Sequence, residues 1–473
     1  MNQIEDIKKL QIKNRLLSIV HDRFYIETKL KFPKSYSVIP NERCGNWYLK
    51  QQELSCYFKS TDGHSNQWNF SYRRLNLNIL PSLYENKGIV IVDSSKYRKI
   101  PDSLSKTIPI WCCVLGLIIN ESFFLNTKNE VDLSKFNIIS EFFLRLPIEL
   151  EIVKNEYNSI LNKLIEFYKE SKKYHPNLKD DLKKLGFHNE NSKTLVNLKP
   201  FWVYPGSKTI NDLKQNEYFN EISVTTFNII LCSCSDFHHI SRHHKMIKCQ
   251  PNKEHNKYQV KFDYYQGAGD DHELWSPKLD AQAFNKNIIK FDQILQKTDS
   301  NSLDLLFNYI DNLSPSDYLE YKKANFREIS SNIFLTTNDS LKDIFFKDFD
   351  MVVCFGSTPN VSFPKCSKLY PYLKDDKKGI RYFASICSKL DTEVFSIMKA
   401  NQNQKILISS ESYELNIGTV IIMLVKYNCD SYKKENWNKL KIRQLYLSIC
   451  EKMGENINTS RLLLNTVNQY LLS

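Results

Sequence analysis

Apolar side chains recur every three or four positions along residues 4–24, which is the spacing of one face of an α-helix. An N-terminal amphipathic helix is therefore predicted. From residue 36 the pattern changes to short apolar pieces separated by polar turns, as expected of strands. These pieces lie at residues 44–49, 54–58, 68–72 and 88–92. Together the two patterns predict a mixed α/β region.

The middle of the chain alternates longer helical and extended patterns. Residues 142–173 predict one or two amphipathic helices, and residues 199–205, 227–234 and 259–264 predict further strands. The strongly apolar residues 108–119 have the length of an element of a protein core, which is shorter than the roughly 20 residues that a membrane-spanning helix needs. No association with a membrane is expected.

The last third of the chain alternates predicted strands with predicted helices. The strands lie at residues 333–335, 350–355 and 405–408, and the helices at 379–390 and 417–427, followed by two terminal helices. Such alternation is typical of a small α/β domain with a mainly parallel sheet.

Length and local composition predict the domain boundaries. At 473 residues the chain exceeds one ordinary hydrophobic core, so two or three units are expected. Residues 287–327 show a polar-faced helical pattern with many Asn and Ser residues, and we interpret them as a helical connector. The prediction is an N-terminal mixed α/β domain at residues 1–286 and a C-terminal α/β domain at residues 328–473.

The net charge of +12 and the pI of about 8.9 favour a polyanionic partner, because Lys and Arg displace counterions from a phosphate backbone. The first residues are polar and acidic, and they match neither a secretory signal nor a transit peptide. A cytoplasmic location is therefore expected. In that reducing compartment the 12 cysteines are expected to be free thiols.

The densest group of chemically capable residues lies in the first quarter of the chain. An apolar strand ends in Asp93 and Ser94, which places a carboxylate and a hydroxyl at the sheet edge where α/β proteins bind ligands. The Asp-Gly-His turn at residues 62–64 brings together an acid, a backbone amide and an imidazole. Residues 59–111 hold eight Lys and Arg against four Asp and Glu, which suits an anionic ligand bound with a divalent metal. The structural alternative is that these residues cap turns, form surface ion pairs and pack in the core.

Two further clusters have two interpretations each. A glycine-rich turn precedes Asp270, Asp271 and His272, which suits Mg²⁺ or a sugar hydroxyl but suits a turn before an acidic helix N-terminus equally well. Cys232 and Cys234, with the histidines that follow, are residue types that bind zinc. Their spacing matches no regular zinc frame, so a buried strand is favoured there.

A strand, a short loop and a helix N-terminus within residues 405–427 form the geometry of an anion cradle. In a dual-specificity phosphatase this loop reads His-Cys-x5-Arg, and here Ser410 stands in the position of the Cys and Asn416 in that of the Arg. Because a serine without a base cannot replace a thiolate nucleophile, phosphatase chemistry is not expected. Docking of an RNA phosphate at Ser410 and Asn416 is a hypothesis, beside a purely structural role for the loop.

These stretches resemble the initiator-tRNA phosphoribosyltransferases along the whole chain. The matching residues are 43–45, 47–48, 58–64, 73–76, 92–94, 101–111, 267–273, 350–356 and 457–467. The resemblance implies transfer of a phosphoribosyl group from phosphoribosyl pyrophosphate to the 2′-hydroxyl of adenosine 64 in the T-stem of initiator methionine tRNA, which keeps this tRNA out of elongation. It also implies an N-terminal transferase region and a C-terminal dual-specificity-phosphatase-like α/β domain, here without the catalytic Cys and Arg. A monomer is expected.

The roles expected of the site residues follow from that reaction. Asp93, together with Asp62, is expected to hold Mg²⁺, and His64 or Asp62 to accept the proton of the 2′-hydroxyl. Lys59, Arg73, Arg74 and Lys106 are expected to bind the 5-phosphate and the pyrophosphate. The remaining expected site residues are Ser94 beside Asp93 and the substrate-binding residues Arg43, Ser60, Thr61, Gly63, Arg98, Asp102, Asp270, Asp271 and His272.

A different class of function is a catalytically inactive phosphatase-like scaffold that binds RNA. It accounts for the positive charge and for Ser410, but it gives no role to the acidic and basic residues of the first quarter. A lysine-rich helix face at residues 154–184 is a candidate for RNA contact, although the exterior of a solvated helix has the same pattern.

Overall fold

The contacts within the computed structural model divide the chain into two units. The first is Met1–Ser71 with Asn76–Tyr318, and the second is Tyr72–Leu75 with Leu319–Ser473. The structure describes residues 2–42, 44–50, 54–147, 152, 154–188, 194–207, 216–219, 222–237, 244–249, 258–270, 275, 279–298, 301–313, 326–330, 332–338, 341, 349–356, 367–371, 377–395, 404–411, 413–427, 437–453 and 459–472.

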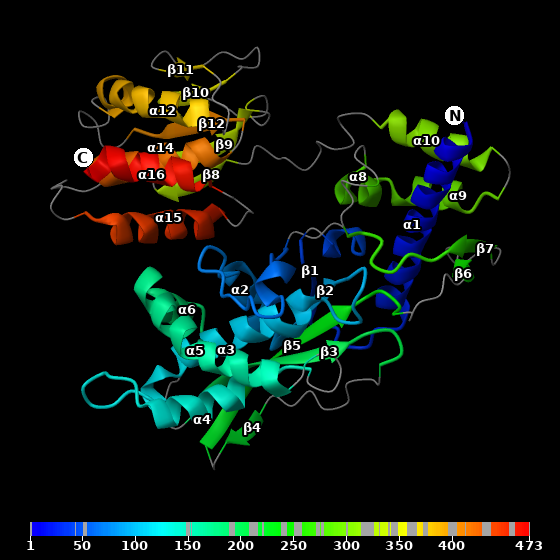
Figure 1. Ribbon diagram of the computed structural model, residues 1–473, viewed down its shortest axis with the longest axis horizontal. Helices are drawn as coiled ribbons and strands as arrows, with labels where there is room; N and C mark the ends of the chain where they lie inside the picture. Colours follow the sequence, from blue (N-terminus) through cyan, green and yellow to red (C-terminus); the bar gives the residue numbers. More distant parts are fainter. Residues whose placement is uncertain are drawn as a thin grey trace. The chain divides into compact units, whose positions relative to one another are not determined.

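A mainly parallel sheet forms the centre of the first unit (Figure 1). Its parallel neighbours run in the order β1 (Ser37–Pro40), β2 (Gly88–Asp93), β5 (Ile222–Ser233) and β3 (Thr194–Val203). A short strand, β4 (Asn216–Phe219), pairs antiparallel with β5. All six residues of β2 are buried, as expected of a strand in a sheet covered on both faces.

Helix α3 (Ile108–Ile119) is buried along its whole length. Because it is apolar on all sides, it packs between β3 and three other helices. These helices are α4 (Leu133–Phe143), α5 (Lys154–Tyr174) and α6 (Leu178–Lys184). The helical prediction at residues 142–173 is confirmed from residue 154 by α5, whereas residues 144–147 are not helical. The strands predicted at 199–205 and 227–234 are confirmed as β3 and β5. A further helix, α2 (Leu80–Asn86), packs on β2.

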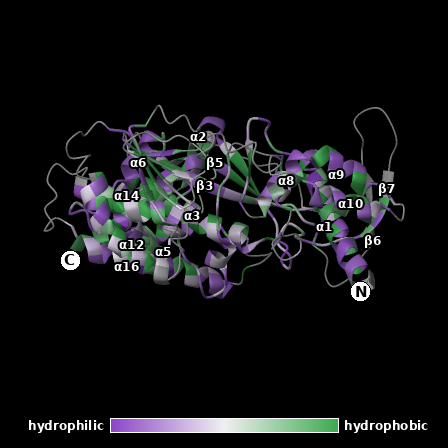
Figure 2. Ribbon diagram, turned by 90° about the horizontal axis from the view of Figure 1, so that it is seen from above, coloured by the Kyte–Doolittle hydropathy of each residue, from purple (hydrophilic) through white to green (hydrophobic). Residues whose placement is uncertain are grey.

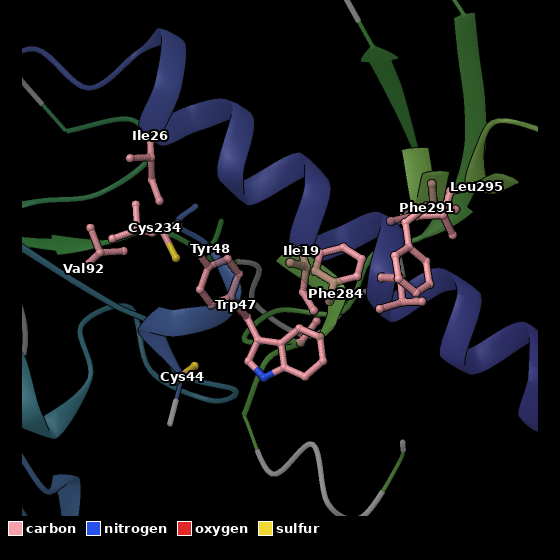
Figure 3. Packing of buried hydrophobic residues seen from close by; sticks show 14 of the residues in the cluster. Ile19, Ile26, Cys44, Trp47, Tyr48, Val92, Cys234, Phe284, Phe291 and Leu295 are labelled. Atoms are coloured by element: carbon pink, nitrogen blue, oxygen red, sulfur yellow. The ribbon is translucent and has the colours of Figure 1, made fainter. Parts of the chain in front are cut away.

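A second group of helices packs around the predicted N-terminal helix, α1 (Asn2–Thr28). It comprises α8 (Ala281–Lys286), α9 (Ile288–Leu295) and α10 (Ser302–Asp311), with a hairpin of β6 (His244–Cys249) and β7 (Tyr258–Asp263) nearby in Figure 1. Figure 3 shows their shared core, where the Trp47 and Phe284 rings lie 5.6 Å apart. The helices after residue 287 therefore add buried residues to the core of the first unit.

The second unit contains a five-stranded sheet. The strand order is β11 (Lys368–Tyr370), β10 (Met351–Phe355), β12 (Ile406–Ser410), β9 (Ile333–Thr337) and β8 (Arg327–Ser330), and only β8 is antiparallel to its neighbour. The helices of this unit are α12 (Lys377–Leu390), α14 (Tyr413–Tyr427), α15 (Lys439–Met453) and α16 (Arg461–Leu472). The prediction of a small α/β domain with a mainly parallel sheet is confirmed.

Three strands predicted near the N-terminus are wrong for the residues that the structure describes. Residues 44–49 contain the single turn η1 (Gly45–Trp47), Cys56 forms only an isolated bridge with Asn41, and 68–72 form no strand. A Cβ at Gly45 would lie 2.3 Å from the Val92 carbonyl oxygen, so the chain turns tightly against β2. The apolar alternation in this region reflects burial of side chains from turns.

Figure 2 shows hydrophobic residues concentrated on the strands of the first sheet and mixed colours on the surrounding helices. Nine cysteines whose side chains the structure describes are free and buried, in agreement with the predicted free thiols. Burial raises the pKa of the Cys232 and Cys234 thiols, which agrees with a buried strand end. Among the described residues, no helix is long and apolar enough to cross a membrane.

Candidate functional site

A cavity of about 740 Å³ lies at the carboxyl ends of the parallel strands β1 and β2. Asn41 and Glu42 follow β1 directly, and Ser94 and Ser95 follow β2. The described residues that line it are Asn41, Glu42, Cys44, Tyr57, Phe58, Lys59, Ser60, Thr61, His64, Asp93, Ser94, Ser95, Tyr97, Arg98, Asp102 and Asp270. A cavity of this size, with a few converging polar groups, suits a small-molecule ligand.

Asp93, the last residue of β2, provides a buried carboxylate in the cavity. Its Oδ2 accepts hydrogen bonds from Asn41 Nδ2 (2.7 Å) and Ser103 Oγ, and its Oδ1 accepts one from the Ser94 amide (2.8 Å). Burial raises the pKa of Asp93 to about 6, and these hydrogen bonds oppose part of the shift. The carboxylate can therefore exchange a proton or bind a cation near neutral pH.

Asn41 joins three segments of the site. Its Nδ2 donates to Asp93 and to the Phe58 carbonyl (3.0 Å), and its Oδ1 accepts from the Phe58 amide (2.7 Å). The Trp111 ring holds Phe58 from another direction, in a T-shaped contact with ring centroids 5.3 Å apart. Asn41 thus fixes the chain before Lys59 beside Asp93.

Lys59 leads into the single turn η2 (Ser60–Gly63), which forms one wall of the cavity. Thr107 Oγ1 donates to the Lys59 carbonyl at 2.9 Å. A Cβ at Gly63 would lie 2.6 Å from the Asp102 carbonyl oxygen, so the absence of a side chain permits this close packing. The turn is therefore held directly against the chain around Asp102.

Asp102 gathers three cationic or titratable side chains. Lys106 Nζ and Arg98 Nη1 lie 2.7 Å and 3.2 Å from Asp102 Oδ1, and His64 Nε2 lies 3.7 Å from Asp102 Oδ2. Asp102 is buried, whereas the side chains of Arg98 and His64 are 41% and 49% exposed. One carboxylate thus holds a guanidinium and an imidazole at the cavity mouth.

Lys106 lies behind this group, with 1% of its side chain exposed. Its Nζ is also 3.4 Å from Glu156 Oε1, and Glu156 accepts a hydrogen bond of 3.0 Å from Trp68 Nε1. Because two carboxylates surround the ammonium group, Lys106 supports Asp102. Lys106 is not among the described residues that line the cavity.

A glycine-rich turn closes another side of the cavity. Gly267 has a φ of +58°, and a Cβ there would lie 2.4 Å from the Ser95 carbonyl carbon. Gln266 Nε2 donates to the Ser95 carbonyl oxygen at 2.8 Å. The turn brings Asp270 to the cavity, where its negative charge contributes to the raised pKa of Asp93.

The structure brings most of the expected site residues of the first unit to this cavity. Those that line it are Lys59, Ser60, Thr61, His64, Asp93, Ser94, Arg98, Asp102 and Asp270. Gly63 supports one wall, and Asp62, in the same turn, is not among the described lining residues. Arg43, Asp271 and His272 lie outside the described residues.

Arg73 and Arg74 belong to the segment Tyr72–Leu75, which groups with the second unit. Arg73 Nη1 donates to Tyr446 Oη at 3.4 Å, and the Leu75 amide donates to Glu451 Oε2 at 3.0 Å. These contacts place the segment against α15 within that unit. Neither arginine is among the described residues that line the cavity.

The phosphatase-like loop of the second unit has buried polar residues. Ser410 ends β12 and is 1% exposed, and Asn416 in α14 is fully enclosed. The Asn416 side-chain amide donates to the Thr336 carbonyl at 2.9 Å. In this arrangement Asn416 joins α14 to β9, which is a structural contact.

Sequence reasoning did not single out several residues around the cavity. Asn41 was visible in the polar stretch after the first strand, but its bonds to Phe58 and Asp93 depend on the fold. Glu42, Tyr57, Ser95 and Tyr97 also line the cavity, in polar stretches that the sequence indicated without a role for these residues. Asp22 and Ser235, behind Ser94, were missed. Asp22 carried no signal, because it lies within the N-terminal helical pattern.

The cavity can accommodate a magnesium ion, although the described residues contain no group of three His, Cys, Asp or Glu side chains placed to hold a metal. Mg²⁺ usually keeps several waters and takes one or two protein carboxylates along with phosphate oxygens of its substrate. Asp93 and Asp270 are two carboxylates that line one cavity and interact electrostatically. These two residues therefore fit a magnesium ion that is bound mainly through a phosphorylated substrate.

Comparison with known proteins gives matches over nearly the whole chain. It is 32% identical over 527 aligned positions to tRNA A64-2′-O-ribosylphosphate transferase of Saccharomyces cerevisiae, across 99% of this chain and 94% of that protein. It is also 32% identical over 280 positions to an uncharacterized protein of Schizosaccharomyces pombe, across 58% of this chain and 52% of that protein. No solved structure matches the chain.

Family models assign both units. The Rit1 N-terminal domain matches residues 6–311, and the Rit1 DUSP-like domain matches residues 368–471. The resemblance found in the sequence is thereby confirmed, as is the phosphatase-like C-terminal domain. The chain belongs to the Rit1 family.

Proposed function

We propose that this protein transfers a phosphoribosyl group from phosphoribosyl pyrophosphate to the 2′-hydroxyl of adenosine 64 in initiator methionine tRNA. The observation that carries the proposal is the cavity at the ends of β1 and β2, which combines Asp93 with the His64–Asp102–Arg98 cluster. The likeness to a tRNA A64-2′-O-ribosylphosphate transferase over 99% of the chain supports the same reaction.

The donor is a sugar with a phosphate and a pyrophosphate, so its binding site must stabilise several negative charges. Lys59 and Arg98 line the cavity and supply positive charge, and Ser60 and Thr61 supply hydroxyls and amides in a tight turn. Because the buried Asp102 orients Arg98, the guanidinium is held in place before the ligand arrives. We assign these residues to the phosphate groups of the donor.

In the reaction the bond between the donor C1 and the pyrophosphate oxygen breaks, and the tRNA 2′-oxygen forms a bond to the same carbon. Pyrophosphate leaves with the electron pair of the broken bond, and the 2′-hydroxyl loses its proton. We assign this proton to His64, since its imidazole lines the cavity and Asp102 Oδ2 lies 3.7 Å from Nε2. Asp102 stabilises the imidazolium that forms.

Mg²⁺, when bound, neutralises the negative charge that develops on the pyrophosphate leaving group. Asp93 and Asp270 are the residues assigned to it. The pKa of Asp93, raised to about 6 by burial, means that this carboxylate is mostly ionised above neutral pH and can bind a cation there.

The tRNA is assigned to the rim of the cavity at residues 96–99. Tyr97 is 78% exposed and lines the cavity mouth. Lys96 Nζ lies 5.0 Å from the Tyr97 ring centroid, and Lys99 Nζ lies 3.9 Å from that of Tyr204. Lysines beside the site can contact the phosphates that flank the acceptor ribose, since such contacts position RNA without reading its bases.

The lysine-rich face of α5 and α6 offers less free charge for RNA. Lys172 and Lys179 both bind Glu121, with Nζ–O distances of 2.7 Å and 2.9 Å. Lys184 pairs with Asp181 at 3.0 Å. The two pairs with Glu121 link α5 to α6, and the third lies within α6. These pairs favour the rim as the site of RNA contact.

Transfer from labelled phosphoribosyl pyrophosphate tests the proposed function directly. The purified chain is incubated with the donor carrying label in its ribose, with Mg²⁺, and with initiator or elongator methionine tRNA. We expect label in the initiator tRNA and resistance of the linkage after position 64 to alkaline cleavage, because that cleavage requires a free 2′-hydroxyl. Label in neither tRNA, with intact RNA binding, would favour the inactive scaffold.

A further inference from the structure

We propose that the buried Asp22 sets the direction of a hydrogen-bond chain that makes Ser94 an acceptor for a ribose hydroxyl of the donor. This inference rests on the proposed function, because it assigns a sugar contact within the same cavity. Asp22 and Ser235 act in it as positioning residues, and Ser94 as the group that touches the donor.

The chain begins at the carboxylate of Asp22, which lies in α1 and is 1% exposed. Asp22 Oδ2 accepts a hydrogen bond of 2.6 Å from Ser235 Oγ, and Oδ1 accepts one of 2.8 Å from Tyr264 Oη. A carboxylate can only accept, so the proton of Ser235 points to Asp22. Ser235 then has only acceptor positions left for its other contacts.

Ser94 is the next member of the chain, with its Oγ 2.6 Å from Ser235 Oγ. Because the Ser235 proton is already committed to Asp22, the Ser94 hydroxyl must be the donor in this contact. The Gly267 amide, 3.2 Å from Ser235 Oγ, fills a further acceptor position of that oxygen. Ser94 therefore directs its only proton away from the cavity.

Tyr48 fixes the other side of Ser94. The Gly269 amide donates to Tyr48 Oη at 3.0 Å, and Tyr48 Oη donates to Ser94 Oγ at 3.3 Å. Burial raises the pKa of Tyr48, so the phenol keeps the proton that it donates. Figure 3 shows the Tyr48 ring beside α1, with Val92 of β2 and Cys234, which follows β5, on another side, and all of these residues belong to one buried core.

The consequence is a fixed polarity at the cavity wall. The protons run from Gly269 through Tyr48, Ser94 and Ser235 to Asp22. A hydroxyl oxygen has two acceptor positions, and Tyr48 fills one of those on Ser94. The other lies within hydrogen-bond reach of the buried Cys44 thiol, a weak donor that the stronger 2- or 3-hydroxyl of the donor ribose would displace.

The test is binding of phosphoribosyl pyrophosphate in the presence of Mg²⁺ and absence of tRNA, measured by calorimetry. In Asp22→Asn the amide group can turn toward Ser235, whose proton then turns to Ser94 and reverses the chain. We expect donor affinity to fall about tenfold in Asp22→Asn and in Ser235→Ala, because Ser94 is then no longer held as an acceptor and can turn its proton toward the sugar hydroxyl. Ser235→Thr, which keeps the hydroxyl, should restore the affinity.

Two controls separate this role from damage to the fold. Tyr264→Phe removes the hydrogen bond from Tyr264 to Asp22 Oδ1 and the one that Tyr264 accepts from the Asp236 amide. Neither bond lies on the chain from Ser94 to Asp22 Oδ2, so donor affinity should stay at the wild-type level. The double variant Asp22→Asn with Ser235→Ala should bind no more weakly than Ser235→Ala alone, because both changes act on one chain.

Donor affinity in Asp22→Asn within twofold of the wild type, with an unchanged melting temperature, would overturn the proposal. An equal loss of donor affinity in Tyr264→Phe would also overturn it, because a structural change around Asp22 would then explain both results. Because binding is measured without transfer, the outcome is distinct from the transferase assay: donor binding without label transfer contradicts only the proposed reaction.

Discussion

The side-chain amide of Asn41 donates a hydrogen bond of 2.7 Å to Asp93 Oδ2, joining the ends of two neighbouring parallel strands. The same amide group pairs with both backbone polar atoms of Phe58. One asparagine thus sets the spacing between the buried carboxylate and the turn that follows Phe58.

Asn41→Ala is expected to lower both donor affinity and the stability of the first unit. The substitution leaves the Phe58 amide and carbonyl without their side-chain partner and removes one donor from Asp93. These losses should lower the free energy of unfolding by about 2–3 kcal/mol. The measurements are urea unfolding and calorimetric titration with phosphoribosyl pyrophosphate. Asn78→Ala, which removes an exposed bond to the Ser55 carbonyl, is the matched control and should change neither by much.

The raised pKa of Asp93 predicts a pH dependence of activity. If the ionised carboxylate is required, kcat/KM should fall about tenfold per pH unit below pH 6 and level off above it. Added Mg²⁺ should move the midpoint to lower pH, because a cation stabilises the ionised form. A profile whose acid limb persists unchanged in Asp93→Asn would assign that limb to another group.

The same shift predicts a pH dependence of stability with the opposite sign to a salt-bridged carboxylate. The pKa of Asp93 is higher in the folded chain than in the unfolded one, so its contribution is fully present below about pH 4 and is lost as pH rises through about 6. The free energy of unfolding falls by up to about 3 kcal/mol over this pH range. Urea unfolding at pH 4.5 and pH 7.5 should show a smaller difference between the two pH values in Asp93→Asn than in the wild type.

Lys106→Met is expected to destabilise the first unit strongly. It removes the ammonium between Asp102 and Glu156, and the loss of one partner from a buried ion pair costs about 3–5 kcal/mol. Lys184→Met breaks the exposed pair with Asp181 and should change stability by less than about 1 kcal/mol. Thermal unfolding of both variants measures the difference, and equal melting temperatures would contradict the enclosed role of Lys106.

Gly267→Ala is expected to displace the chain at Ser95 and reduce donor binding. The new Cβ would lie 2.4 Å from the Ser95 carbonyl carbon, and the φ of +58° adds strain of about 1 kcal/mol. Gly206→Ala has the same kind of strain, at φ +85°, but nothing lies within 4 Å of its Cβ. Donor affinity should therefore fall only in Gly267→Ala. In urea unfolding, both variants should have a lower free energy of unfolding than the wild type.

The rim lysines predict a selective effect on tRNA. Lys96→Ala with Lys99→Ala should raise KM for tRNA severalfold and leave donor affinity unchanged, and the slope of log KM against log salt should fall by roughly one for each phosphate that is no longer bound. The control is Lys169→Ala with Lys183→Ala, two exposed lysines of α5 and α6. A larger change in the control pair would move the RNA site to those helices.

Local pattern was sufficient for several features because they depend on neighbours in sequence. Helical spacing identified α1, and the unbroken apolar run of β2 identified a buried strand that ends at Asp93. The alternation of strands and helices was sufficient for the mainly parallel sheet of the second unit. Residue type placed Asp93, His64 and Arg98 among the candidates, and all three line the cavity.

Tertiary structure decided which of the candidates meet. Lys106 and Arg98 carry similar charge in sequence, yet one is enclosed by two carboxylates and the other is at the cavity mouth. Asp22 became relevant only because α1 packs against the segment that carries Ser235, more than 200 residues later. Contacts of this kind depend on how distant segments pack, and no local spacing records that packing.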